Sequence, residues 1–148
     1  MKVAVLMGSP NDADKMKGAR MILERFGIEV DERVSSAHRN PSDVAEFATN
    51  ARDEGFGVII CGAGMACALP GAVAAHTTLP VIGVPLSGSA LNGVDALYSA
   101  VQMPPGIPVA TVAIDGAKNA GILAAEILAV TDQDLAQRLA DFRAGGAR

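Results

Sequence analysis

The stretch VSSAHRNPSD, residues 34–43, places one of the two histidines of the chain between two serines and an arginine. His38 carries an imidazole, a group that can both donate and accept a proton. Arg39 can bind a phosphate group through paired hydrogen bonds from its guanidinium. The stretch is therefore either a polar turn or a site that holds a phosphorylated ligand beside a proton-transfer group.

A second polar segment, GSPND, covers residues 8–12. Ser9 and Asn11 offer side-chain donors beside the free N–H groups of a helix start, which is a common position for a bound phosphate. Asp12 would repel a phosphate but suits the hydroxyl groups of a ribose. The same residues also form an ordinary helix cap, with Ser9 before Pro10, so this segment alone does not decide between the two interpretations.

A third segment, GAGMACALPG, covers residues 62–71 and is built of side chains too small to do chemistry themselves. Its glycines would let the backbone approach a planar ligand closely and expose N–H groups. It lacks the longer glycine pattern of dinucleotide sites and the Lys-Ser/Thr of a P-loop, which argues against NAD and ATP. Cys61 and Cys67 match no metal spacing, so we expect two buried thiols and no metal site.

Apolar runs alternate with amphipathic segments along all 148 residues, which we interpret as one domain. We expect strands at residues 2–7, 28–34, 57–61, 79–85 and 107–114, and helices near residues 13–26, 40–54, 69–77, 92–101, 117–130 and 132–143. The second strand is the most polar and should be less covered than the others. This order of elements predicts an α/β fold with a parallel sheet covered by helices on both faces.

The three unusual segments each follow one of the first three expected strands. In a parallel sheet the carboxyl ends of the strands share one edge, and ligands bind in the crevice outside that edge. The topology therefore brings all three segments to one rim, and this convergence is the main evidence in the sequence for a functional site. The other histidine, His76, falls near a helix C-terminus and has a structural explanation there.

Charge and hydropathy exclude other classes of partner. The formal net charge is -4 and no basic run is present, which argues against nucleic-acid binding. An anionic ligand must then be held by local donors rather than by a general positive field. No apolar stretch reaches the length of a membrane span and the N-terminus has no signal-peptide pattern, so we expect a cytoplasmic protein without membrane association.

Several motifs occur together in one order: MGSPND, SAHR, GAG with LPG, PVIGVP, LNGVDALYS and VQMPPGIPVATVAI. With these motifs the chain resembles the N5-carboxyaminoimidazole ribonucleotide mutase family of purine biosynthesis over nearly its whole length. The resemblance implies a three-layer flavodoxin-like fold and a homo-octamer with sites shared between subunits. It also implies an imidazole ribonucleotide as substrate, and neither a metal nor an organic cofactor.

The resemblance also assigns roles to single residues. His38 corresponds to the catalytic histidine, which would act as a general acid and base while a carboxylate moves from the exocyclic nitrogen to ring carbon four. The substrate-binding residues expected from the motifs are Ser9, Asn11, Asp12, Ser36, Arg39, Ala63 and Gly64. Among them, Ser36 would join the phosphate end of the site.

Two positions depart from the family pattern. Asn11 replaces the usual serine and keeps a donor, whereas Ala68 precedes LPG at a position where the mutases usually carry histidine. Related carboxylases that use free carbon dioxide also lack that histidine, but they have lysine after SAH and read SNALSG instead of MACALPG. The sequence favours the mutase. Aminoimidazole ribonucleotide carboxylase and a non-catalytic flavodoxin-like nucleotide-binding module are the alternatives, and only the module would have no use for His38.

Overall fold

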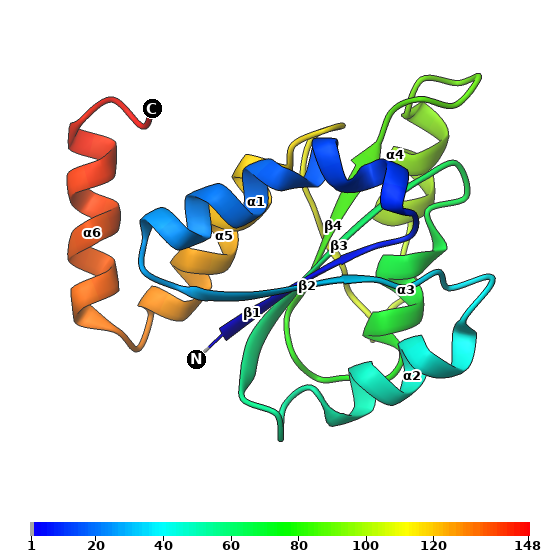
Figure 1. The fold of residues 1–148 in the computed structure, drawn as a ribbon, viewed down its shortest axis with the longest axis horizontal. Helices are drawn as coiled ribbons and strands as arrows, with labels where there is room; N and C mark the ends of the chain where they lie inside the picture. The colour runs from blue at the N-terminus through cyan, green and yellow to red at the C-terminus, as the bar shows by residue number, and fades with distance from the viewer. Residues whose placement is uncertain (1) are drawn as a thin grey trace.

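The computed structural model describes residues 2–148, and its centre is a parallel sheet with the strand order β2-β1-β3-β4-β5 (Figure 1). The strands are β1 (Lys2–Met7), β2 (Glu29–Val34), β3 (Phe56–Gly64), β4 (Val81–Leu86) and β5 (Ala110–Thr111). All neighbouring pairs are parallel. The carboxyl ends of the strands therefore share one edge of the sheet, as the sequence predicts.

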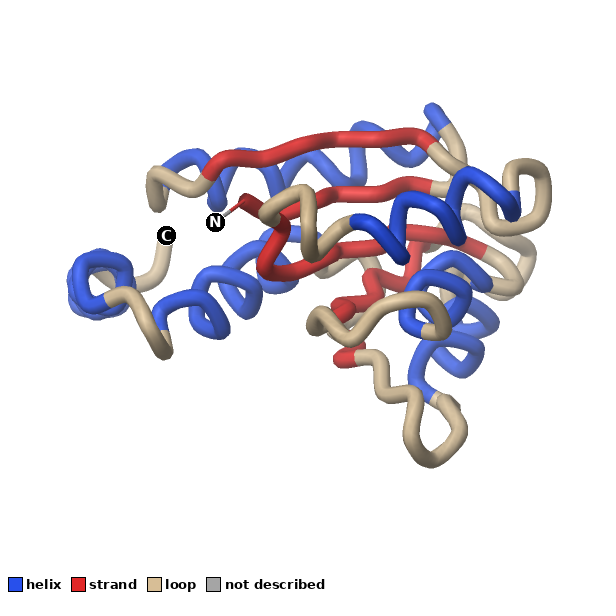
Figure 2. Tube along the Cα trace, turned by 90° about the horizontal axis from the view of Figure 1, so that it is seen from below, coloured by secondary structure: helices blue, strands red, loops and turns tan. Residues whose placement is uncertain are grey.

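Helices cover both faces of this sheet. They are α1 (Ala13–Arg25), α2 (Pro41–Asn50), α3 (Ala68–Ala74), α4 (Val94–Val101), α5 (Ala117–Ala129) and α6 (Gln133–Ala144), and a single 3-10 turn, η1 (Pro10–Asp12), precedes α1. Helices α1 and α5 lie on one face and α2, α3 and α4 on the other, while α6 stands outside α5 (Figures 1 and 2). This three-layer arrangement confirms the predicted flavodoxin-like α/β fold. None of these helices is long and apolar enough to cross a membrane.

Strand β1 shows how the sheet divides the core into two halves. Successive side chains of a strand point to opposite faces, and a strand covered on both faces must be apolar throughout. Val3 and Val5 pack with α1 and α5, whereas Ala4 and Leu6 pack with α2 and α3. The run KVAVLM is thus buried from Val3 onward, which explains why it shows no alternation of polar and apolar residues.

Strand β2 lies at the edge of the sheet, which confirms the prediction that this polar strand is less covered. Arg33 lies over the ring of Phe47, 4.5 Å from its centroid, and donates to Asp31 at 2.8 Å. The hydrogen bond from Arg33 lowers the pKa of the Asp31 carboxyl below its ordinary value. The guanidinium of Arg33 thus lies over an aromatic ring and is paired with a carboxylate at the same time, so a polar residue covers this edge of the sheet.

Several element boundaries differ from the prediction, among them the end of α2, which is Asn50 rather than a residue near 54. Strand β3 continues past Cys61 to Gly64, because residues 62–64 pair with residues 84–86 of β4 and are strand rather than loop. Strand β5 is reduced to two residues. Pro108, which lacks an N–H group, precedes it at this sheet edge. Helix α3 begins one residue earlier than expected and ends at Ala74 instead of Thr77.

Helices α1 and α5 approach each other closely at Gly121, and this contact gives a stability test. A Cβ atom at Gly121 would lie 2.4 Å from Cγ2 of Ile22 and 2.9 Å from the carbonyl oxygen of Ala19. Overpacking of this kind typically costs about 1–3 kcal/mol, so Gly121→Ala should lower the free energy of unfolding by that amount. Urea unfolding at fixed protein concentration measures the effect.

Gly18 is the matched control for this test, because it lies in α1 at the same helix pair. A Cβ atom there would meet nothing closer than the main-chain nitrogen of Lys118 at 3.4 Å. Gly18→Ala should therefore be neutral or stabilising by up to about 1 kcal/mol, the helix-propensity gain of alanine. Equal unfolding midpoints for the two variants would contradict the close packing at Gly121.

Candidate functional site

A cleft of about 470 Å³ opens at the carboxyl edge of the sheet, where the segments that follow β1, β2, β3 and β4 meet. His38 and all the substrate-binding residues expected from the motifs line it: Ser9, Asn11, Asp12, Ser36, Arg39, Ala63 and Gly64. The expectation that the segments after the first three strands share one rim is therefore met in the fold.

The segment after β1 combines a helix cap with a donor-rich rim. The Ser9 side chain accepts a hydrogen bond from the N–H of Asn11 at 3.2 Å and caps η1. The cap and the binding interpretation of this segment therefore coexist, because the cap holds Ser9 and Asn11 at the cleft. Burial raises the pKa of the Asp12 carboxyl, and this rise is partly opposed by the main chain of Ser9 and by the charge of Lys15.

The segment after β2 is a tight turn that displays His38 and Arg39. The Ser36 side chain accepts a hydrogen bond from the N–H of Arg39 at 3.2 Å, and the Ser36 carbonyl accepts one from the N–H of Asn40 at 2.7 Å. Asn40 precedes α2 as predicted, but its side chain makes no capping bond. His38 and Arg39 are exposed, and within residues 2–148 no carboxylate forms an ion pair with Arg39. The guanidinium is therefore open to an anionic ligand.

The segment after β3 supplies an apolar wall and contains strained backbone. Met65 and Cys67 have φ angles of 54° and 42°, a left-handed conformation that is unusual for residues with side chains and that often occurs at functional sites. Ala66, Ala68 and Leu69 line the cleft beside them. Position 68, at which the chain departs from the family pattern, therefore faces the candidate site.

Gly62 does not serve the cleft as the sequence suggested. A Cβ atom there would lie 2.3 Å from the sulfur of Met16, so the glycine makes room for α1 to pack on the sheet. Gly64, in contrast, lines the cleft together with Ala63. Of the two glycines in the Gly-x-Gly motif, Gly62 thus allows helix packing and Gly64 lines the cleft.

The segment after β4 also lines the cleft, through Ser87, Gly88 and Ser89, and the sequence analysis did not assign it to the site. The signal was available, because this small polar stretch follows a strand of the same parallel sheet. His76, the other histidine, is exposed beyond the end of α3 and does not line the cleft. Among residues 2–148, no three His, Cys, Asp or Glu side chains are grouped as metal ligands.

A parallel sheet between two layers of helices, with a polar cleft at its carboxyl edge, is typical of flavodoxin-like proteins that bind a small molecule. Within that class, the chain belongs to the AIR carboxylase family, whose model matches residues 2–148. It is 53% identical over 142 residues to the N5-carboxyaminoimidazole ribonucleotide mutase of Thermotoga maritima, an alignment that covers 96% of this chain and 83% of that protein.

Two further relatives show the range of the family. A phosphoribosylaminoimidazole carboxylase of Schizosaccharomyces pombe is 51% identical over 140 residues, which are 95% of this chain and 25% of that protein. The crystal structure of Treponema denticola PurE matches with a TM-score of 0.86 at 31% identity, over 98% of this chain and 90% of that chain. Relatives of this chain thus carry either name, mutase or carboxylase.

The two cysteines allow a test of how deeply the segment beside the cleft is buried. Burial raises the pKa of Cys67 to about 11 and raises that of the fully buried Cys61 further. Because the thiolate is the reactive form, alkylation of the native protein by iodoacetamide should be at least about a hundredfold slower than that of free cysteine. Intact mass spectrometry gives the rates, and denatured protein is the control. Rapid modification of either thiol in the native protein would contradict its burial.

Proposed function

We propose that the protein is an N5-carboxyaminoimidazole ribonucleotide mutase, an isomerase that forms 4-carboxy-5-aminoimidazole ribonucleotide in purine biosynthesis. Its relatives in Thermotoga maritima and Bacillus subtilis carry that name at 53% and 52% identity. The observation that carries the proposal is the turn at His38 and Arg39. There an imidazole and a guanidinium line one cleft, and these groups are suited to proton transfer and to anion binding.

The ribonucleotide would be anchored through its two polar parts. Arg39 and the hydroxyl of Ser36 are suited to the phosphate, with Ser9 and Asn11 adding donors at the start of η1. The carboxyl group of Asp12, which also lines the cleft, can accept hydrogen bonds from the ribose hydroxyls. With the sugar phosphate fixed, the imidazole ring would lie between His38 and the apolar wall.

His38 would then act twice on the ring. A carbamate loses carbon dioxide once its nitrogen is protonated, so His38 first donates a proton to the exocyclic nitrogen. Ring carbon four attacks the released carbon dioxide, and His38 afterwards accepts the proton that leaves that carbon. One proton is donated and one is recovered, so the overall reaction is an isomerisation.

The apolar wall would keep the carbon dioxide in place between the two steps. Ala63, Ala66, Ala68 and Leu69 offer no hydrogen bonds from their side chains and line the cleft. A small apolar molecule held there recombines with the ring faster than it escapes, and water is kept from the intermediate. Alanine at position 68 fits this part of the mechanism, because it adds only a methyl group to the wall.

The first test compares the two histidines. His38→Asn should lower kcat by about 10²–10⁴-fold, the usual contribution of a general acid and base, while ribonucleotide binding stays measurable by calorimetry. His76→Asn is the matched control, since that histidine is also exposed but lies outside the cleft. Unchanged turnover in His38→Asn would remove the proposed mechanism and favour a binding module without catalysis.

The second candidate function is aminoimidazole ribonucleotide carboxylase, and the name of the Schizosaccharomyces pombe relative favours it. The purified protein can be given the carbamate substrate, or the free amine with and without bicarbonate, while product absorbance is followed. The mutase should form product from the carbamate without added bicarbonate. Product formed only from the amine with bicarbonate would identify the carboxylase instead.

We further propose that the protein assembles into a homo-octamer in the cytoplasm. Leu91, Val94, Tyr98 and Val101 are exposed at intervals of three and four residues, so they form one apolar stripe on α4 and the segment before it. Contiguous apolar surface of this kind is typical of an interface. The resemblance to the family supports eight copies with shared sites, and the two free thiols fit a reducing compartment.

Assembly can be tested at the centre of this stripe. Tyr98, which is 64% exposed in the single chain, would be buried by another copy. Tyr98→Glu should then give smaller species in light scattering, because a buried unpaired carboxylate is strongly unfavourable. Val130→Glu, at a residue 78% exposed on the opposite face of the sheet, is the control and should leave the assembly intact. An unchanged mass for Tyr98→Glu would place the interface elsewhere.

A further inference from the structure

A polar network of three residues lies directly behind the wall that segment 87–89 contributes to the cleft. The ammonium group of Lys15 donates to the carbonyl oxygen of Ser87 at 2.6 Å and to its hydroxyl at 2.7 Å. The carboxylate of Asp115 accepts from the N–H of Ser87 at 2.9 Å and from its hydroxyl at 2.5 Å. Lys15 and Asp115 also form an ion pair at 3.8 Å. Three elements distant in the chain are thus joined at Ser87.

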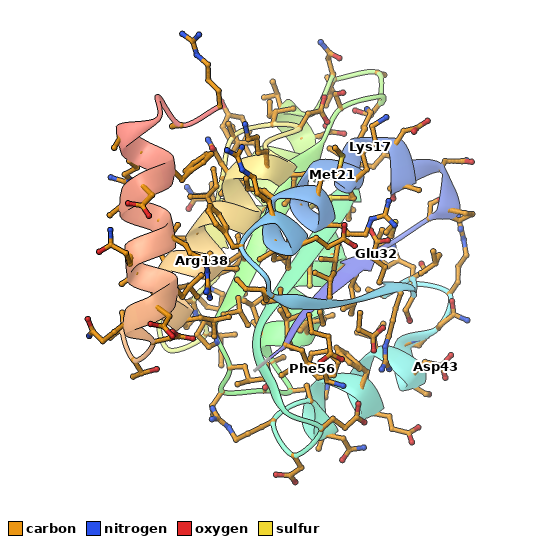
Figure 3. The ribbon with its side chains drawn as sticks, turned by 60° about the vertical axis from the view of Figure 1, so that its left-hand side comes forward. Lys17, Met21, Glu32, Asp43, Phe56 and Arg138 are labelled. Carbon is orange, nitrogen blue, oxygen red and sulfur yellow. The ribbon has the colours of Figure 1, made fainter. Side chains whose placement is uncertain are left out.

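Lys15 is less exposed than Lys17, the next lysine of the same helix. Its side chain is 34% exposed, whereas that of Lys17 is 60% exposed and pairs only with Asp14. Figure 3 shows Lys17 on the outer side of α1. The ammonium group of Lys15 is therefore partly removed from water and bonded to Ser87, whereas Lys17 is an ordinary surface lysine.

Asp115 is held in place independently of Lys15. Its main-chain N–H donates to the carbonyl of Pro85 at 2.9 Å, and its φ angle of 57° turns the side chain back toward the end of β4. Aspartate and asparagine tolerate this left-handed conformation better than other residues with side chains. The Ser87 bonds and the charge of Lys15 hold the pKa of Asp115 below its ordinary value despite partial burial, so the carboxylate stays charged near neutral pH.

The network uses all the polar groups of Ser87 but not the main-chain N–H groups of the next two residues. Both polar groups of its main chain and its hydroxyl are bonded to Lys15 or Asp115. On the other side of the segment, the Ser89 hydroxyl donates to Asp95 at 3.0 Å. Among residues 2–148, the main-chain N–H groups of Gly88 and Ser89 have no acceptor. Two donors on a clamped segment therefore remain available at the cleft.

Lys15 also places a positive charge close to this rim. A Cβ atom added to Gly88 would lie 3.4 Å from the ammonium nitrogen, so Lys15 stands immediately behind that glycine. The same charge acts on Asp12, where it opposes the effect of burial on the pKa. Without Lys15, the carboxylates of Asp12 at the cleft and of Asp115 behind it would lose the positive charge that acts on both of them.

We propose that Lys15 and Asp115 are positioning residues that clamp segment 87–89, so that the free N–H groups of Gly88 and Ser89 form part of the ligand-binding surface. The identity of the ligand, an imidazole ribonucleotide, rests on the proposed function. The clamp itself rests on the hydrogen bonds at Ser87. Neither residue would touch the reacting atoms, so the clamp acts on affinity more than on the chemical step.

The test compares Lys15→Met with Lys17→Met. The first variant keeps the length of the side chain and removes the donor and the charge, so KM should rise about tenfold while kcat changes less than about threefold. The second should leave both constants unchanged. Thermal unfolding of both variants checks that the difference does not come from loss of the fold.

Asp115 provides a graded second test. Asp115→Asn keeps an acceptor for the N–H of Ser87 and tolerates the left-handed backbone, whereas Asp115→Ala keeps neither. The affinity for aminoimidazole ribonucleotide, measured by calorimetry, should therefore fall more in Asp115→Ala than in Asp115→Asn. A purely structural role predicts lower unfolding temperatures with unchanged affinity in both.

The outcomes separate the clamp from the proposed reaction. If Lys15→Met matches Lys17→Met in KM and in ribonucleotide affinity, the clamp is wrong even though the mutase activity stands. If the unaltered protein binds the ribonucleotide without turnover, the proposed reaction fails while the loss of affinity in Lys15→Met still supports the clamp. Absence of binding by the unaltered protein would overturn both.

Discussion

The parallel pairing of β1 with both β2 and β3, and of β3 with β4, is the constraint on which the site depends. It brings four connecting segments to one edge of the sheet, so residues far apart in the chain line one cleft. The pairing of β3 with β4 also shortens the loop after β3, because Gly62, Ala63 and Gly64 remain paired in the sheet up to the rim of the cleft. A change in strand order would disperse these groups even if every side chain were kept.

The cleft combines two environments that a single chemistry requires. One side offers hydroxyls, main-chain donors and the guanidinium of Arg39, while the other offers methyl groups and Leu69. In a protein of net charge -4, an anion is favoured only where such donors are concentrated. The proposed reaction would use both environments, one for a charged sugar phosphate and one for carbon dioxide.

Much of the fold follows from local signals in the sequence. Gly27, with a φ angle of 73°, follows the end of α1, and the buried strands show as apolar runs. The meeting of the segments after β1, β2 and β3 at one cleft was predictable, because parallel strands share a carboxyl edge. The Lys15 network was not, because its partners lie 72 residues apart in one bond and 28 in another and no local pattern marks them. The short β5 and the long β3 depend on pairing at the sheet edges, which composition does not encode.

The outer helix α6 has a consequence for how the chain can be built into larger proteins. It is held to the body by a T-shaped contact between Phe26 and Phe142, with ring centroids 5.3 Å apart. The start of β1 and the residues after α6 both lie on the left-hand side of Figures 1 and 2, away from the carboxyl ends of the strands. Additional domains could therefore be joined at either terminus without shielding the cleft from its ligand. The Schizosaccharomyces pombe relative, in which the matching part is a quarter of the protein, has such an extended architecture.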